Sequence, residues 1–358
     1  MGGWSMARFC ASDGSDDSSE EEDTWRDFSC EGPQDVSQQD AENCAYVCAA
    51  RYTPAVYDWM TGDAPRVQPY ARAIAKAAAG KHVLDIGTGR DAVLALLCAR
   101  AGAKSVVAVE VVPEVAEQAR ETVSRAGFAH CVRIIAGHSA KVELPRVDLV
   151  VHEIVGHIST EEGAATVISD LQQRPEVVDC TVPGWLLPRQ FETRILPVAL
   201  RIPDDAGNAM SGGGRTLSLP DWYMRKALVL GDLQVLDNLN DQPPAAIEQK
   251  RRLCWTMPAF AKLTGFVCAP FIDLDGEEFV DAWSEWTSWR RKMVVLPRPV
   301  NVGLGDQLIL DFVADLRRFP PKYVFASKLV RTSAGRAVQE SLGDVVVTHD
   351  MFSGSKCS

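Results

Sequence analysis

Three features are missing from this chain of 358 residues, and each absence argues against a class of protein. The ten cysteines include no C-x-x-C pair, and Cys44 with Cys48 has no second half, so no metal site is predicted. No apolar run reaches the roughly 18 residues that a membrane-spanning helix needs. The start has neither an apolar signal core nor a basic flank. We therefore expect a soluble, cytoplasmic or nuclear protein with reduced thiols and no membrane partner.

Clusters of lysine and arginine are also scarce. The net charge is -11 at pH 7, and much of it comes from the acidic segment 13–27. Because duplex nucleic acid is bound by clustered cations, we expect no direct nucleic-acid partner, and a mildly acidic surface suits a cationic substrate. Residues 1–42 are polar and acidic, and they cannot bury enough apolar surface to offset the entropy of ordering. They are predicted to form a disordered tail.

What the sequence does contain, from Lys81 onward, is an alternation of β-branched runs and amphipathic segments. We predict strands over 82–86, 105–110, 132–135 and 147–151, and helices over 92–101, 113–126 and 161–172. Continuous apolar strands between helices indicate a parallel sheet covered on both faces. Before this region, 67–76 has helical apolar spacing and belongs to a structured N-terminal lid. Residues 43–182 are thus predicted to form a doubly wound α/β domain.

The residue composition changes after Pro183, where β-branched and aromatic segments dominate. Strands are predicted over 191–200, 259–267, 291–296, 307–313 and 344–348, so residues 183–358 should form a mostly antiparallel β domain. A Gly-rich loop is expected over 204–214. A short helical excursion is expected over 219–239.

A nucleoside site is predicted where the first strand meets the following helix. Gly87 and Gly89 permit close backbone approach to a ligand, and helix-terminal N–H groups add positive potential. Glu110 ends the second strand, where a carboxylate can accept both ribose hydroxyls. The glycines also satisfy a dinucleotide fingerprint. Asp85 favours S-adenosylmethionine over a nicotinamide cofactor, because a carboxylate there suits a cationic amino acid and repels pyrophosphate.

Several separated motifs resemble those of the protein arginine methyltransferases. The segment Met60-x-x-Asp63-x-x-Arg66-x-x-x-Tyr70 resembles the helix that carries the family's cofactor-binding arginine. The match runs from about residue 46 to about residue 311. The resemblance implies a Rossmann-like class I methyltransferase domain followed by an antiparallel β-barrel-like domain, with S-adenosyl-L-methionine as cofactor and S-adenosyl-L-homocysteine as product. It assigns to the cofactor Met60, Arg66, Asp85, Gly87, Gly89, Glu110, Ser139 and Glu153.

A second motif resembles the family's double-glutamate hairpin. Glu153 and Glu162 lie nine positions apart, and the resemblance assigns both to catalysis, gripping the substrate guanidinium. Without it, Glu161 and Glu162 would be interpreted as solvated acids at a helix start. A third motif, Trp286-Thr-Ser288-Trp289, resembles the family's Thr-His-Trp loop. Substrate contacts are assigned to Tyr57, Ser288 and Trp289.

The expected function is methyl transfer to the guanidino nitrogen of arginine in proteins. Departures from the family pattern leave alternatives open, because Ser288 stands where the family has His, Ala140 replaces an adenine-binding acid, and Asp91 replaces a third glycine. These alternatives are methylation of another cationic amine or small molecule, and a catalytically inactive interaction paralogue. The resemblance also implies a homodimer, with a candidate dimerisation arm near 217–240.

Overall fold

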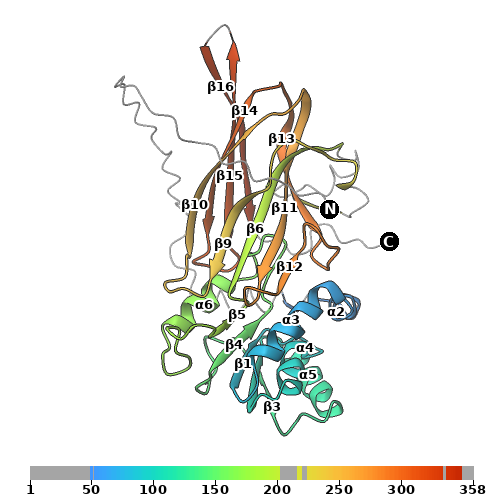
Figure 1. Ribbon diagram of the computed structural model, residues 1–358, viewed down its shortest axis with the longest axis vertical. Helices are drawn as coiled ribbons and strands as arrows, with labels where there is room; N and C mark the ends of the chain where they lie inside the picture. The colour runs from blue at the N-terminus through green and yellow to red at the C-terminus, as the bar shows by residue number, and fades with distance from the viewer. Residues whose placement is uncertain (1–48, 51, 202–215, 220–223, 334–335, 349–358) are drawn as a thin grey trace. The chain divides into compact units, whose positions relative to one another are not determined.

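The computed structural model describes residues 49–50, 52–201, 216–219, 224–333 and 336–348 (Figure 1). The predicted tail at 1–42 and the predicted Gly-rich loop at 204–214 lie outside these residues, as does part of the candidate arm. In the described ranges, no helix combines the length and apolar character needed to cross a membrane.

Five parallel strands form the first sheet, in the order β3-β2-β1-β4-β5. The elements of this half are α2 (Pro54–Thr61), α3 (Ala64–Ala77), β1 (His82–Ile86), α4 (Val93–Arg100), β2 (Ser105–Glu110), α5 (Pro113–Arg125), β3 (Val132–Ala136), β4 (Leu149–His152), α6 (Ala164–Gln172) and β5 (Leu186–Leu187). β1 lies at the centre of the sheet and is almost fully buried, as its apolar sequence requires. The strand order reverses between β1 and β4, and ligands of open α/β sheets bind at such a switch point.

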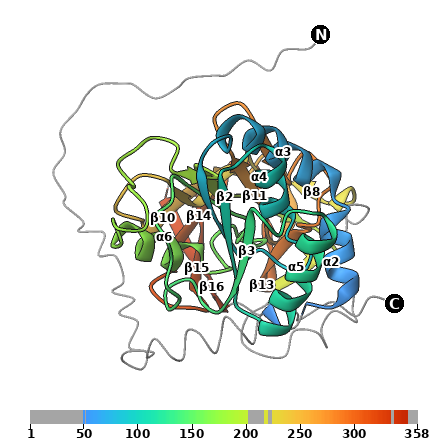
Figure 2. The ribbon, with the colours of Figure 1, turned by 90° about the horizontal axis from the view of Figure 1, so that it is seen from below.

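Helices cover both faces of this sheet. Figure 2 shows α4 and α5 on one side and α6 on the other. This follows from right-handed crossovers, because the chain moves outward in one direction through β1, β2 and β3 and then returns across the sheet to β4.

Two antiparallel sheets follow. One has the order β10-β14-β15-β16, and the other has β7-β13-β11-β6-β8 with β9 paired to β6 and β12 paired to β11. Their bounds are β6 (Gln190–Ala199), β7 (Thr216–Leu219), β8 (Leu228–Val229), β9 (Gln234–Asn240), β10 (Glu248–Thr256), β11 (Ala261–Asp273), β12 (Phe279–Asp281), β13 (Arg291–Val302), β14 (Gln307–Asp315), β15 (Lys322–Ser333) and β16 (Arg336–Thr348). Buried aromatic side chains such as Trp255, Phe266 and Phe312 fill the core of this region. The predicted fold class is confirmed.

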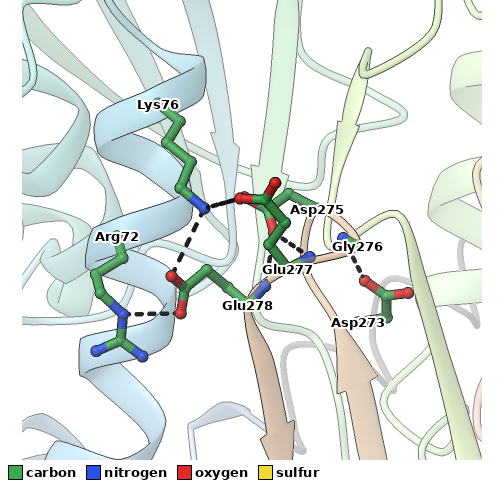
Figure 3. Close-up of polar contacts among 7 residues, drawn as sticks. All are labelled: Arg72, Lys76, Asp273, Asp275, Gly276, Glu277 and Glu278. Carbon is green, nitrogen blue, oxygen red and sulfur yellow. Dashed lines mark hydrogen bonds and ion pairs between the residues drawn. The ribbon is translucent and has the colours of Figure 1, made fainter.

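Helix α3 is tied to the turn between β11 and β12 by surface ion pairs (Figure 3). Arg72 Nε lies 2.7 Å from Glu278, and Lys76 Nζ lies 3.1 Å from Asp275 and 2.9 Å from Glu277. The N-terminal lid therefore contacts the second half of the chain directly.

Two predicted helices differ in the structure. In the described part of 219–239, Met224 is helical, but β8 and most of β9 follow, so the predicted helical excursion is wrong over these two strands. Pairing of β9 with β6 places Leu236 and Leu239 in the core, and this tertiary pairing outweighs local helical preference. The helix predicted over 161–172 begins only at Ala164, because Gly163 at its N-cap has a φ of 88°. Glu161 and Glu162 thus precede the helix.

Candidate functional site

The glycine loop after β1, residues 87–89, has a left-handed backbone conformation at both glycines. Gly87 and Gly89 have φ values of 75° and 63°, which glycine adopts without steric cost. The loop is fixed by Glu110, at the end of β2. One carboxylate oxygen accepts the N–H of Gly89 at 3.0 Å, and the other accepts the N–H of Val112 at 3.0 Å. Glu110 is buried, and burial raises its pKa.

Asp85 lies beneath this loop and is fully buried. The Thr88 hydroxyl donates to its Oδ2 at 2.6 Å, whereas Oδ1 is buried with no hydrogen-bond partner in the described part of the chain. Burial raises the pKa of Asp85 to about 7, and the Thr88 hydrogen bond opposes that rise. A buried acceptor without a donor is costly, so Oδ1 is suited to receive a donor group from a ligand.

Arg66, in the first turns of α3, is surrounded by other predicted site residues. Its Nη1 lies 2.7 Å from Glu153 Oε2, and its Nη2 donates to the Met60 carbonyl at 2.6 Å. Its guanidinium lies over the ring of Trp289, 5.6 Å from the centroid. Nε is buried 3.9 Å from Asp63 Oδ2 and has no hydrogen-bond partner among the described residues. Arg66 therefore connects residues assigned to the cofactor with residues assigned to the substrate.

The two acids of the hairpin differ in their partners. Glu153 follows β4 and pairs with Arg66, whereas Glu162 accepts a hydrogen bond from the Tyr52 hydroxyl at 3.1 Å. Within the described part of the chain, Glu162 forms no ion pair. Burial raises the pKa of Glu162 well above its ordinary value, and the negative charges of Glu153 and Glu161 raise it further. One carboxylate of the pair is thus poised to gain a cationic partner.

The loop that resembles Thr-His-Trp packs against the other side of this region. The backbone N–H of Ser288 donates to Asp63, and the Trp289 indole N–H donates to the Val155 carbonyl at 2.6 Å. Trp289 is 7% exposed and therefore belongs to the packed interior beside the site, whereas Trp286 is 64% exposed. The Ser288 side chain is a hydroxyl, which does not take up a proton near neutral pH as an imidazole does.

Tyr57 lies beside the glycine loop. A Cβ added at Gly89 would lie 3.4 Å from its ring, and the Arg90 guanidinium lies 5.3 Å from the ring centroid. The Tyr57 ring also packs 5.8 Å, centroid to centroid, from Tyr52, whose hydroxyl donates to Glu162. Ser139 is buried after β3, and its carbonyl accepts from Arg174 at 3.0 Å. Among the described residues, no hydrogen bond joins Tyr57 or Ser139 to Glu153 or Glu162.

Sequence reasoning missed a buried network that anchors the hairpin. The Thr160 hydroxyl donates to Asp237 of β9 at 2.6 Å and contacts the Tyr323 hydroxyl of β15 at 2.9 Å. The Ser159 N–H donates to Thr193 Oγ1 of β6 at 2.7 Å. Ser159, Thr160, Thr193 and Asp237 are all fully buried. An acid in the apolar strand Val-Leu-Asp237 was the only sequence signal for this network.

Over part of its length the chain is similar in sequence to curated protein arginine N-methyltransferases. No family model matches the chain. Its sequence is 28% identical over 196 residues to protein arginine N-methyltransferase PRMT10 of Arabidopsis thaliana, covering 54% of this chain and 48% of that protein. It is 34% identical over 107 residues to protein arginine N-methyltransferase 1 of Oryza sativa subsp. indica, covering 28% of this chain and 27% of that protein. The matches thus span about half or less of these curated relatives.

Solved structures extend the similarity to the whole fold. A crystal structure of Arabidopsis thaliana protein arginine methyltransferase 10 matches with a TM-score of 0.67 and 19% identity, covering 84% of this chain and 99% of that chain. The Trypanosoma brucei PRMT1 enzyme-prozyme heterotetrameric complex with AdoHcy matches with a TM-score of 0.66 and 18% identity, over the same shares. At these identities the structural likeness shows the fold. Together with the sequence matches, it shows that this chain is similar in sequence and in fold to protein arginine N-methyltransferases.

Proposed function

We propose that this chain transfers a methyl group from S-adenosylmethionine to the guanidino nitrogen of an arginine in a protein substrate. The observation that carries the proposal is the unequal pairing of the two hairpin acids. Arg66 compensates Glu153, while Glu162 lies in the same buried region with no ion pair in the described part of the chain. A substrate with one positive charge would give Glu162 a cationic partner.

The residues at the edge of the parallel sheet fit the cofactor. The orphaned Oδ1 of Asp85 is an acceptor suited to an ammonium or another N–H donor, and the orphaned Nε of Arg66 is a donor suited to a carboxylate. An amino acid end group carries both. Glu110 would accept the ribose hydroxyls, and the backbone of Gly87 and Gly89 would approach the nucleoside. When bound, S-adenosylmethionine supplies an electrophilic methyl group on a sulfonium.

The protein's own groups would prepare the arginine for this reaction. A guanidinium remains cationic at physiological pH, so its nitrogen lone pairs are delocalised. Carboxylates of Glu153 and Glu162 would hold the group through charge-assisted hydrogen bonds and draw positive charge toward the nitrogens that they contact. The remaining nitrogen gains electron density for attack.

A proton must leave the nitrogen that is methylated. Since Ser288 replaces an imidazole, the acceptor has to come from elsewhere in the site. Glu162 suits this role because burial and neighbouring negative charges raise its pKa, which makes its carboxylate more basic.

Assembly and location belong to the same proposal. The chain is proposed to act as a homodimer in the cytoplasm or nucleus, with an arm near 217–240 in the interface. The heterotetramer of the Trypanosoma brucei relative supports assembly of this fold into oligomers. Light scattering of the purified full chain measures the oligomeric state.

The activity is tested by incubating the full chain with labelled S-adenosylmethionine and a protein-derived peptide that contains arginine. A matched peptide with lysine in place of each arginine is the control. Mass spectrometry is expected to find added methyl groups on arginine alone. Transfer to the lysine peptide, or to neither peptide while cofactor binds, overturns the proposal.

A further inference from the structure

Glu161, next to the proposed catalytic Glu162, is almost completely buried at 1% exposure. Its Oε2 lies 2.7 Å from Nζ of Lys292 on β13, and its Oε1 accepts the backbone N–H of His157 at 2.7 Å. Lys292 is also buried, at 6% exposure. The carboxylate thus joins a strand of the β domain to the middle of the acidic hairpin.

Gly156 gives this carboxylate its space. A Cβ at position 156 would lie 2.2 Å from Cγ of Glu161 and 2.6 Å from its Oε1. The side chain of Glu161 therefore folds back flat over the hairpin instead of pointing toward the site. Any side chain larger than hydrogen at position 156 would displace it.

Stability alone is a weak explanation for such a pair. Removing both charges from water costs several kcal/mol per ion, and the attraction within the pair often only offsets that cost. What a buried pair does supply is one specific geometry, because either charge left alone is strongly unfavourable. Here the geometry that is fixed is that of the residue before Glu162.

We propose that Glu161, held by Lys292, is a positioning residue that sets the carboxylate of Glu162 on the side of Glu153. In the sequence, Glu162 is flanked by Glu161, which pairs with Lys292, and by Gly163, which packs against Phe319. A Cβ added at Gly163 would lie 2.7 Å from the Phe319 ring. Both neighbours of Glu162 therefore contact the β domain. The inference rests on the proposed function, because it names what prepares the substrate-binding acid.

The pair also affects the charge around the hairpin. Three acids lie on the hairpin, at positions 153, 161 and 162. Arg66 pairs with Glu153 and also lies 3.9 Å from Asp63, whereas Lys292 pairs with Glu161. Without Lys292, the carboxylate next to Glu162 would lose its cationic partner.

The test compares Glu161→Gln, Lys292→Met and the double variant in steady-state methylation of an arginine peptide. Each single variant is expected to lower kcat/KM on the order of 10- to 100-fold through misplacement of Glu162, with cofactor affinity unchanged by calorimetry. The double variant should recover thermal stability relative to Lys292→Met, because no buried charge is left unpaired. Its kcat/KM should stay low. Recovery of kcat/KM together with stability would show a merely structural pair and overturn the inference.

Asp273 provides a matched control away from the hairpin. It is 7% exposed, accepts the Gly276 N–H at 2.7 Å and pairs with Arg189 at 2.5 Å, which repeats the contacts of Glu161 (Figure 3 shows Asp273 and Gly276). Asp273→Asn is expected to lower stability and leave kcat/KM unchanged. An equal loss of kcat/KM in this variant would also overturn the inference.

Failure of the inference is distinguishable from failure of the proposed function. If the unmodified chain methylates no arginine peptide, the function fails, and hydrogen exchange of residues 153–163 still tests positioning. Glu161→Gln and the double variant should then both show faster exchange in this segment than the unmodified chain. Unchanged exchange in both variants contradicts the inference.

Discussion

Nη1 of Arg66 and Oε2 of Glu153 lie 2.7 Å apart, so a single ion pair joins the predicted cofactor cation to a predicted substrate acid. The same guanidinium stacks over Trp289 and donates to the Met60 carbonyl. Changes at Glu153 are therefore expected to reach the cofactor through Arg66, whereas Glu162 forms no ion pair with Arg66 among the described contacts.

Glu162→Gln should be the cleaner catalytic variant of the two. Its kcat is expected to fall on the order of 100- to 1000-fold, since one charge-assisted contact to the guanidinium is lost. Calorimetry should find an S-adenosylmethionine affinity within about 2-fold of that of the unmodified chain, which is a small difference in binding free energy. Glu153→Gln should lose activity equally but also change cofactor affinity. Near-normal turnover of Glu162→Gln would remove that residue from the reaction.

The pH dependence of kcat/KM should report on Glu162. The reaction needs its charged form, and protonation increases as pH falls, so activity should decline below its raised pKa, at a higher pH than an ordinary glutamate near 4.3 predicts. Tyr52→Phe removes a hydrogen bond that lowers this pKa, and the acidic limb should move to higher pH. A limb that moves to lower pH contradicts the assignment.

Glu161→Gln should move the same limb in the opposite direction. The negative charge of Glu161 raises the pKa of Glu162, and removing it lowers that pKa, so activity should persist to lower pH. The groups that act on Glu162 are Tyr52, Arg66, Glu153 and Glu161. Loosening of the hairpin by itself predicts no such directed shift. A pH profile of kcat/KM for both variants makes the comparison.

Glu110→Gln should weaken cofactor binding by disturbing two structures at once. An amide in place of the carboxylate loses charge-assisted acceptance of the Gly89 and Val112 N–H groups, which fix the glycine loop. It also accepts ribose hydroxyls less strongly. We expect cofactor affinity to fall about 10-fold or more, since hydrogen bonds to charged groups contribute about 1.5–3 kcal/mol each. Glu117→Gln, on the exposed face of α5, is the control in calorimetry.

Thr160→Val should destabilise the whole fold. It leaves Oδ2 of the fully buried Asp237 without the Thr160 donor, and an unsatisfied charged acceptor costs about 1–3 kcal/mol. Urea unfolding followed by circular dichroism measures the loss. Thr256→Val removes the hydroxyl of an exposed pair with Gln307 and should change stability little. Equal effects of the two substitutions would show that the buried network is not an anchor.

The sequence predicted the parallel sheet well, because the mainly apolar pattern of the buried strands β1 and β2 is visible within each segment. The helical interpretation was wrong over β9, because the conformation of this strand depends on pairing with β6, some forty residues earlier. Glu161 was interpreted as part of a helix for a similar reason. Its partner Lys292 lies 131 positions away, and only the folded chain brings the two together.

The catalytic roles of Glu153 and Glu162 stay predictions, but the spacing that selects these two acids is visible in the sequence. The ion-pair partners of the hairpin are not. Spacing within one hairpin is a local property that a motif records, whereas the pairing of Glu153 with Arg66 and of Glu161 with Lys292 depends on how separate elements pack.

The hydroxyl network under the hairpin has a consequence for exchange of parts between relatives. Ser159 and Thr160 belong to the α/β half of the chain, yet they form hydrogen bonds with Thr193, Asp237 and Tyr323 of the β half. A chimera that joins this first half to a relative's barrel would keep the hairpin acids but lose the hydrogen bonds that anchor the hairpin. Only barrels that supply equivalent acceptors and hydroxyls at these three positions can be swapped in without loss, so the two halves must diverge together.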